Sequence, residues 1–211
     1  MATSALDAAF RMPPGAPRVA AVARALSAGD SDAAAAASAR SATGHTRLCQ
    51  ALLQGVEVEA LQLLMEAGAS PNTAEPGCAS MLHFFVANQK PRQVQQLLTL
   101  GCDWRLPDRQ NGDAALASAI KAMAVNPVKD RSSTLGARLE VVRMLAQADG
   151  GACARYRHPR TASTALHEAA SAGDARVVQL LLDLVPGIEV RGAGRGDEVR
   201  RGWQGWQLVF D

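Results

Sequence analysis

The residues that could do chemistry in this chain are few and far apart. Its four cysteines contain no C-x-x-C pair; they are Cys49, Cys78, Cys102 and Cys153. Zinc sites are built from clustered thiolates and imidazoles, so this spacing predicts no metal site and no cofactor. A disulfide framework in a secreted domain would be denser. We therefore interpret the cysteines as reduced, partly buried thiols of an intracellular protein.

Common catalytic motifs are also missing from the sequence. There is no G-x-S-x-G nucleophile elbow and no Ser–His–Asp set in that local form. The glycine-rich run Gly192–Gly196 lacks the flanking strand and helix of a phosphate-binding loop. Only four histidines are present, and no pair of carboxylates converges on a predicted pocket. We predict that the chain is not an enzyme.

One short basic stretch offers an argument for nucleic-acid binding. Arg155, Arg157, His158 and Arg160 surround Tyr156, a mixture of charge and aromatic character that suits nucleic acid. The formal net charge of +2 is too balanced to sustain neutralisation of many phosphates. No apolar run approaches the roughly 18 residues that a membrane span needs. We expect a monomer that binds protein rather than nucleic acid or membrane, in the cytoplasm or alternatively in the nucleus.

The helical elements that must position the candidate residues recur along the chain, twice at the same interval and once at a longer one. Similar segments begin 34, 34 and 50 residues apart, at Thr46, Ser80, Ala114 and Thr164. A period of about 33 residues is typical of stacked helical hairpins, and the longer spacing indicates one insertion. Hydrophobic residues make up 48% of the chain but aromatics only 4%, which favours closely stacked helices with a core of Ala, Leu and Val.

The fourth of these units carries the most specific motif. Residues 164–173 read T-A-L-H-E-A-A-S-A-G, and residues 177–182 read V-V-Q-L-L-L. Leu166, Ala169 and Ala170 lie at i, i+3 and i+4, which is one face of a helix. The unit resembles the ankyrin repeat, whose pattern is T-P-L-H-x-A-A-x-x-G followed by V-V-x-L-L-L. The motif residues across the chain are Thr46, Leu48, Gly55, Leu82, His83, Leu116, Thr164, Leu166, His167, Ala169, Ala170 and Gly173.

This resemblance implies an all-α fold, an ankyrin-repeat solenoid of about four helix-turn-helix repeats plus a degenerate N-terminal capping helix. It also implies that the motif histidine hydrogen-bonds the backbone of the neighbouring turn, and that the motif threonine is an N-cap. The first unit departs from the pattern, with Arg47 and Cys49 where Pro and His are usual. The third unit has only alanines at the Thr, Pro and His positions.

The chain divides into three parts on this interpretation. Residues 1–43 are a flexible Ala/Ser-rich leader with room for capping helices, 44–191 are the ankyrin repeat domain, and 192–211 are a Gly/Arg-rich tail with an aromatic C-terminus. The repeats lie near 44–76, 77–109, 110–150 and 160–191, with an insertion at 125–134 that we predict to be an exposed loop. Three interpretations of the aromatic residues 203–210 stay open: a cap on the array, a docking peptide, or a truncation product.

The resemblance further implies that a protein partner binds in the concave groove, on the turn tips and the first helix of each repeat. The predicted contacts are Trp104, Arg105, Asp108, Gln110, Asn111, Asp113, Lys121, Tyr156, His158, Arg160, Thr161, Ser163 and Ser171. Packing at the base of a turn is the alternative for Trp104. We expect a non-catalytic interaction scaffold. The alternatives are an adaptor or substrate-recognition subunit of a larger complex, such as a ubiquitin ligase, and a bacterial effector acting on a host protein.

Overall fold

The computed structural model describes residues 5–27, 37–41, 43–109, 111–125 and 132–186. Over these residues the chain is built from α-helices and contains no strand, only two isolated bridges, Arg40 with Thr46 and Glu75 with Cys78. The prediction of an all-α fold is therefore confirmed. No helix among the described residues is long and apolar enough to cross a membrane.

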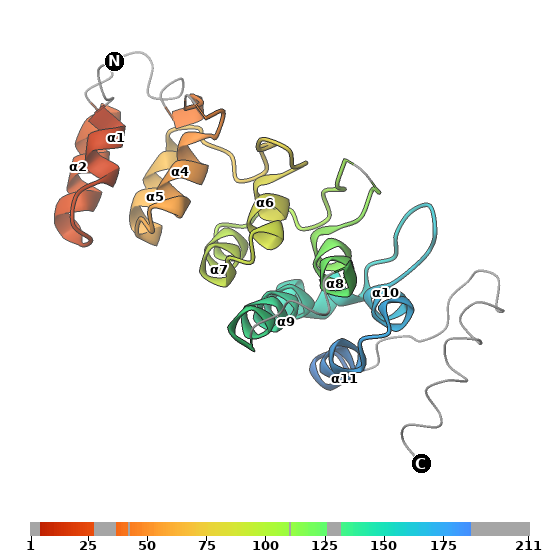
Figure 1. Ribbon diagram of the computed structural model, residues 1–211. Helices are drawn as coiled ribbons and strands as arrows, with labels where there is room; N and C mark the ends of the chain where they lie inside the picture. Colours follow the sequence, from red (N-terminus) through yellow and green to blue (C-terminus); the bar gives the residue numbers. More distant parts are fainter. Residues whose placement is uncertain (1–4, 28–36, 42, 110, 126–131, 187–211) are drawn as a thin grey trace.

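The helices form antiparallel pairs that stack side by side from one end of the molecule to the other (Figure 1). The first helix of each pair lies in one layer: α4 (Arg47–Leu53), α6 (Met81–Ala87), α8 (Ala115–Val125) and α10 (Ala165–Ala172). The second helix lies in the other layer: α5 (Val58–Glu66), α7 (Pro91–Thr99), α9 (Ser132–Arg155) and α11 (Ala175–Leu184). Long turns project beyond the first layer before α6, α8 and α10 and lie along one edge of the stack.

Local sequence signals explain where the first-layer helices begin and end. The hydroxyl of Thr46 accepts a hydrogen bond from the backbone N–H of Cys49, and that of Ser80 from the N–H of His83, so both residues are N-caps. α10 ends at Gly173, whose φ of 70° is the left-handed conformation that favours glycine. These caps keep each first-layer helix to two or three turns.

One continuous hydrophobic core runs through the whole stack. Small side chains such as Ala51, Ala115 and Ala169 are fully or almost fully buried, which allows neighbouring helices to approach closely. Larger side chains of the second layer, such as Leu61 and Leu181, are buried between the pairs. No helix pair could bury its apolar face alone, so the stability of each pair depends on its neighbours.

The N-terminal helices form one more packed pair. α1 (Ala5–Phe10) packs against α2 (Ala16–Ser27), and α2 packs against α5. Phe10 is 1% exposed and Val22 is fully buried. The buried Arg18 donates to the carbonyl oxygens of Met12 and Gly55 at 2.8 and 3.2 Å. Residues 5–27, within the predicted leader, therefore form part of the core.

α9 is the longest helix and follows the predicted insertion. Residues 126–131 lie outside the described residues, and residues 132–134 already belong to α9. The backbone leaves helical geometry at Ala148–Gly151, where Asp149 has a φ of 52°, and a last helical turn ends at Arg155. The tail 192–211, with the aromatic residues 203–210, also lies outside the described residues.

Candidate functional site

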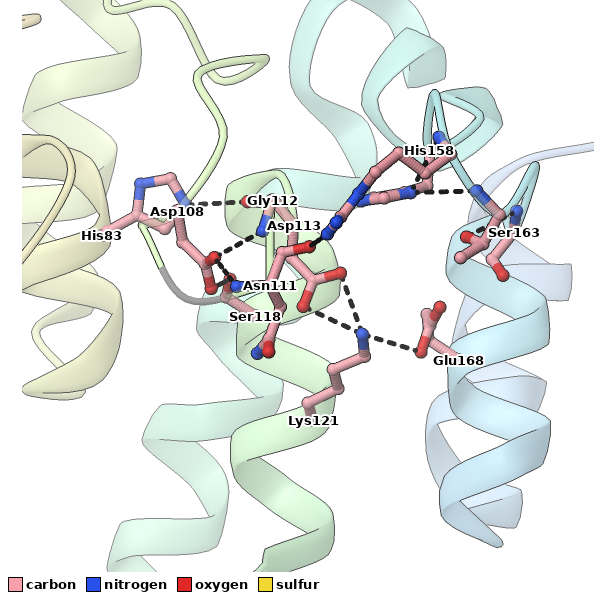
Figure 2. A network of polar contacts seen from close by, with 12 residues as sticks. His83, Asp108, Asn111, Gly112, Asp113, Ser118, Lys121, His158, Ser163 and Glu168 are labelled. Atoms are coloured by element: carbon pink, nitrogen blue, oxygen red, sulfur yellow. Dashed lines mark hydrogen bonds and ion pairs between the residues drawn. The ribbon is translucent and has the colours of Figure 1, made fainter.

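Two neighbouring turn tips bring together most of the predicted contact residues. One tip precedes α8 and the other precedes α10, and Figure 2 shows them joined by a network of polar contacts. α8 and α10 pack directly against each other, which holds the two tips side by side. Gln110 lies outside the described residues.

Asp108 organises the first tip. Its Oδ1 accepts hydrogen bonds from the backbone N–H groups of Asn111 and Gly112, at 2.6 and 2.8 Å. Its own N–H donates to the carbonyl oxygen of Asp113 at 2.8 Å. Burial alone raises the pKa of Asp108, but the backbone hydrogen bonds outweigh it and hold that pKa below its ordinary value. The carboxylate therefore stays charged and fixes the shape of the tip.

His83 connects this tip to the preceding helix pair. Its Nε2–H donates to the carbonyl oxygen of Asp113 at 3.2 Å, and its Nδ1 accepts from the hydroxyl of Ser80 at 2.8 Å. This is the contact with the neighbouring turn that the repeat resemblance implied. Burial lowers the pKa of His83 below its ordinary value, which keeps the imidazole neutral for both bonds. His83 therefore holds the fold rather than a ligand.

Lys121, on α8, joins the first tip to the neighbouring helix α10. Its ammonium group lies 2.8 Å from each carboxylate oxygen of the buried Asp113 and 3.3 Å from Oε2 of Glu168 on α10. Burial lowers the pKa of Lys121, but the hydrogen bond with Asp113 and the charge of Glu168 outweigh it, so the pKa lies above its ordinary value. The Lys121 side chain is still 40% exposed, so one side of it faces solvent.

The second tip is organised by a buried histidine. Nδ1 of His158 accepts hydrogen bonds from the backbone N–H groups of Arg160 and Thr161, both at 3.2 Å. The backbone N–H of His158 donates to the carbonyl oxygen of Ser163 at 2.8 Å. The guanidinium of Arg160 donates to the carbonyl oxygen of Asn111, which ties the two tips together. Arg160, Thr161 and Asn111 are exposed, whereas His158 is buried.

Trp104 and Tyr156 form a second cluster below the tips. Trp104 is 5% exposed and meets Tyr156 edge to face, with ring centroids 5.7 Å apart. The guanidinium of Arg105 lies 4.1 Å from the centre of the Trp104 ring. Packing at the base of a turn, the alternative for Trp104, is therefore its role in the structure. Arg105, with half of its side chain exposed, is the member of this cluster that a partner can reach.

Equivalent positions on the four first-layer helices are exposed or half-buried. Each position lies seven residues after the start of its unit: Leu53, Ala87, Lys121 and Ser171. Ala87 and Ser171 are exposed, as are the following residues Asn88 and Ala122. The row of four equivalent positions therefore has one position on each of α4, α6, α8 and α10.

Leu53 is the residue of this row that sequence reasoning missed. Its side chain is 46% exposed, the larger of the two exposed large hydrophobics among the described residues. The count of seven from Thr46 would have found the position. Its exposure is not visible in the sequence, because periodicity alone does not distinguish an exposed leucine from a buried one.

The polar network of the two tips fixes the positions of their exposed groups. The buried polar groups Asp113, His83 and His158 hold backbone and side-chain partners, so they set the positions of the exposed groups around them. What faces solvent is a mixture of one leucine, small side chains and basic groups. Rigid turns that present such a mixture form a contact surface.

Comparison with known families gives one match. The family model of the ankyrin repeat matches residues 163–189, which include α10 and α11. No curated protein matches the chain. The prediction of an ankyrin repeat in the fourth unit is confirmed by this match.

Proposed function

From the ankyrin repeat at residues 163–189, we propose that the chain is a non-catalytic scaffold that binds a protein partner. In this proposal four successive helix pairs, from α4–α5 to α10–α11, are repeats of one solenoid, and α1–α2 covers its N-terminal end. The partner lies against the first-layer helices and the turn tips before α8 and α10. We further propose that the scaffold acts as a monomer, in the cytoplasm or the nucleus.

The observation that carries this proposal is the row Leu53, Ala87, Lys121 and Ser171. Equivalent residues of four consecutive units reach solvent: Leu53, Ala87 and Ser171 are exposed, and Lys121 is half-buried with 40% of its side chain exposed. Hydrogen bonds hold the neighbouring tips in place. An exposed leucine at one end supplies apolar contact area, and Lys121 supplies a charge whose position is fixed by Asp113. Rigid exposed groups lose little conformational entropy on binding, which favours affinity.

The charges on this face indicate how a partner would be oriented. Arg160 is exposed on the second tip, and Arg105 is exposed in the cluster below the tips, where it pairs with Asp103 and Asp149. The carboxylates of Asp113 and Glu168 are mostly buried and engaged by Lys121. A partner with acidic groups facing the tips and an apolar segment facing Leu53 is complementary to this pattern. Such complementarity sets orientation and association rate more than raw affinity.

The two exposed leucines provide a matched test. Leu53 lies on the first-layer face and is 46% exposed, whereas Leu182 lies on the second-layer helix α11 and is 40% exposed. Leu53→Asp should abolish capture of the partner from a cell lysate, and Leu182→Asp should leave it unchanged. Circular dichroism and thermal melting of both variants check that the fold is retained. Equal capture by both variants would reject this face as the binding surface.

The adaptor alternative requires a second contact in the 125–134 insertion or the 192–211 tail. Residues 126–131 and 187–211 lie outside the described residues, so the proposal of one binding face is the one that geometry supports. A form of the chain shortened after residue 186 separates the two functions. The single-face proposal expects the partner to bind this form with unchanged affinity.

A further inference from the structure

The first helical unit differs from the others where its helix begins. In the second and fourth units a histidine three residues after the N-cap accepts a hydrogen bond from the N-cap hydroxyl: His83 from Ser80 and His167 from Thr164. In the first unit Cys49 stands at this position. The hydroxyl of Thr46 instead donates to the carboxylate of Glu75, which reaches in from the following turn.

Three side chains with metal-binding atoms converge at this point. Nδ1 of His45 lies 2.8 Å from Oε2 of Glu75 and 3.7 Å from Sγ of Cys49. The three donor atoms all lie within 4.8 Å of one another. Imidazole nitrogen, thiolate sulfur and carboxylate oxygen are the donors that Zn²⁺ takes in proteins. Tetrahedral geometry with bonds of about 2.0–2.3 Å sets donor atoms about 3.2–3.8 Å apart. The His45–Cys49 separation of 3.7 Å lies in this range, and the His45–Glu75 separation of 2.8 Å would lengthen by about 0.4 Å on binding.

The surroundings hold the carboxylate in the required orientation. The Glu75 side chain is fully buried, and its Oε1 accepts from the Thr46 hydroxyl at 2.6 Å and from the Thr46 N–H at 3.4 Å. These bonds leave Oε2 directed at His45 and Cys49. The ring of Phe84 packs on that of His45 with centroids 4.9 Å apart and restrains the imidazole. Partners of this kind orient metal ligands and strengthen metal binding.

Burial makes this cluster unlike an ordinary surface ion pair. Cys49 and Glu75 are both buried, whereas the His45 side chain is 18% exposed and gives the site its contact with solvent. A buried carboxylate beside an imidazole and a thiol is costly unless its charge is neutralised. A divalent cation bound to all three groups would balance the charges of the carboxylate and of the thiolate formed on binding.

We propose that His45, Cys49 and Glu75 form a binding site for Zn²⁺ at the junction of the first two helical units. Three protein ligands leave the fourth tetrahedral position to water. On binding, the S–H bond of Cys49 breaks and its proton leaves to solvent. The proton on Nδ1 of His45, which faces Oε2 of Glu75, moves through solvent to Nε2, and Nδ1 then coordinates through its lone pair. No electron is transferred. The bound metal joins the start of α4 to the turn before α6 and so fixes the spacing of two helix pairs.

Titration of the full chain with Co²⁺ tests this site directly. Thiolate coordination to Co²⁺ gives a charge-transfer absorption band, which should saturate at one Co²⁺ per chain and disappear when Zn²⁺ is added. Cys49→Ser should abolish the band. Cys102→Ser and Cys153→Ser should keep it, because these buried thiols belong to other helix pairs. A wild-type chain without a saturable band, or a Cys49→Ser variant that keeps it, would overturn the proposal.

A second variant distinguishes loss of the metal site from loss of the fold. His45 precedes α4 and is partly exposed, so His45→Gln should leave the helical structure intact. Excess Zn²⁺ should raise the melting temperature of the wild type. The His45→Gln variant should bind Zn²⁺ about tenfold or more weakly than the wild type, so its melting temperature should rise less. Equal Zn²⁺-induced shifts in the wild type and a well-folded His45→Gln would also overturn the proposal, because the hydrogen-bonded cluster would then be structural alone.

Discussion

The ammonium nitrogen of Lys121 lies 2.8 Å from each carboxylate oxygen of Asp113, and so ties helix α8 to the turn tip that precedes it. The Asp113 side chain is 3% exposed and that of Lys121 is 40% exposed. Lys121 also meets Glu168 of the next unit at 3.3 Å. One charged side chain therefore sets the position of the tip relative to two neighbouring helices.

A double-mutant cycle should detect this coupling. Asp113→Asn and Lys121→Met, alone and together, should give an interaction energy of about 1 kcal/mol, since one partner is buried and the other is screened by solvent. Urea unfolding followed by circular dichroism measures it. The exposed pair Glu140 and Arg143, at 3.5 Å on α9, is the control and should give about 0.3 kcal/mol or less. Equal coupling in both pairs would contradict the role given to Asp113.

Stability should fall as the pH drops below 6.5. Burial lowers the pKa of His83 from 6.5, so the unfolded chain binds protons that the folded chain excludes. The contribution of the neutral His83 to the free energy of unfolding is therefore complete above pH 6.5. It is lost as the pH falls from 6.5 through the pKa of His83 in the folded chain. Urea unfolding at about pH 7.5 and about pH 5.5 measures the change. His83→Gln should make it smaller but not remove it, because burial also lowers the pKa of His167. The same change in both proteins would show that His83 does not contribute.

Substitution by alanine should change the stability of the protein in opposite directions at two of its glycines. Gly173 ends α10 with a φ of 70°, and a Cβ there meets nothing within 4 Å, so the cost of Gly173→Ala is conformational strain of about 1 kcal/mol. Gly136 lies inside α9 in equally open space, without positive φ. Gly136→Ala should therefore stabilise by about 0.5–1 kcal/mol. Thermal unfolding of both variants measures the two changes in stability. Destabilisation by Gly136→Ala would contradict the prediction.

The N-terminal helix pair should contribute to the stability of the whole stack. Phe10 is 1% exposed in the core between α1 and its neighbours, and Phe10→Ala should lower the free energy of unfolding by about 3 kcal/mol. Leu53→Ala, at a side chain that is 46% exposed, is the control and should cost less than about 1 kcal/mol. Urea unfolding measures both. An unchanged free energy for Phe10→Ala would mean that α1 and α2 unfold independently of the rest.

The sequence alone was enough to identify the repeating unit. The motif of residues 164–173 predicted the helix that became α10 and the turn at Gly173, because caps, left-handed glycines and helical spacing are local signals. It also predicted, through the repeat resemblance, the hydrogen bond from His83 to the turn of the next unit. The residues predicted to contact a partner stay predictions, since their exposure and geometry are known but their binding is not.

Only the tertiary structure decided which of these residues face solvent and which meet one another. Trp104 and Leu53 are both apolar in sequence, yet the stack buries the first and leaves the second 46% exposed. The cysteine spacing gave no indication that His45, Cys49 and Glu75 meet, because Glu75 reaches the other two only when the turn of the second unit packs on the first helix. Such contacts join residues about one repeat apart, and their geometry is set by the packing between helix pairs rather than by any local pattern.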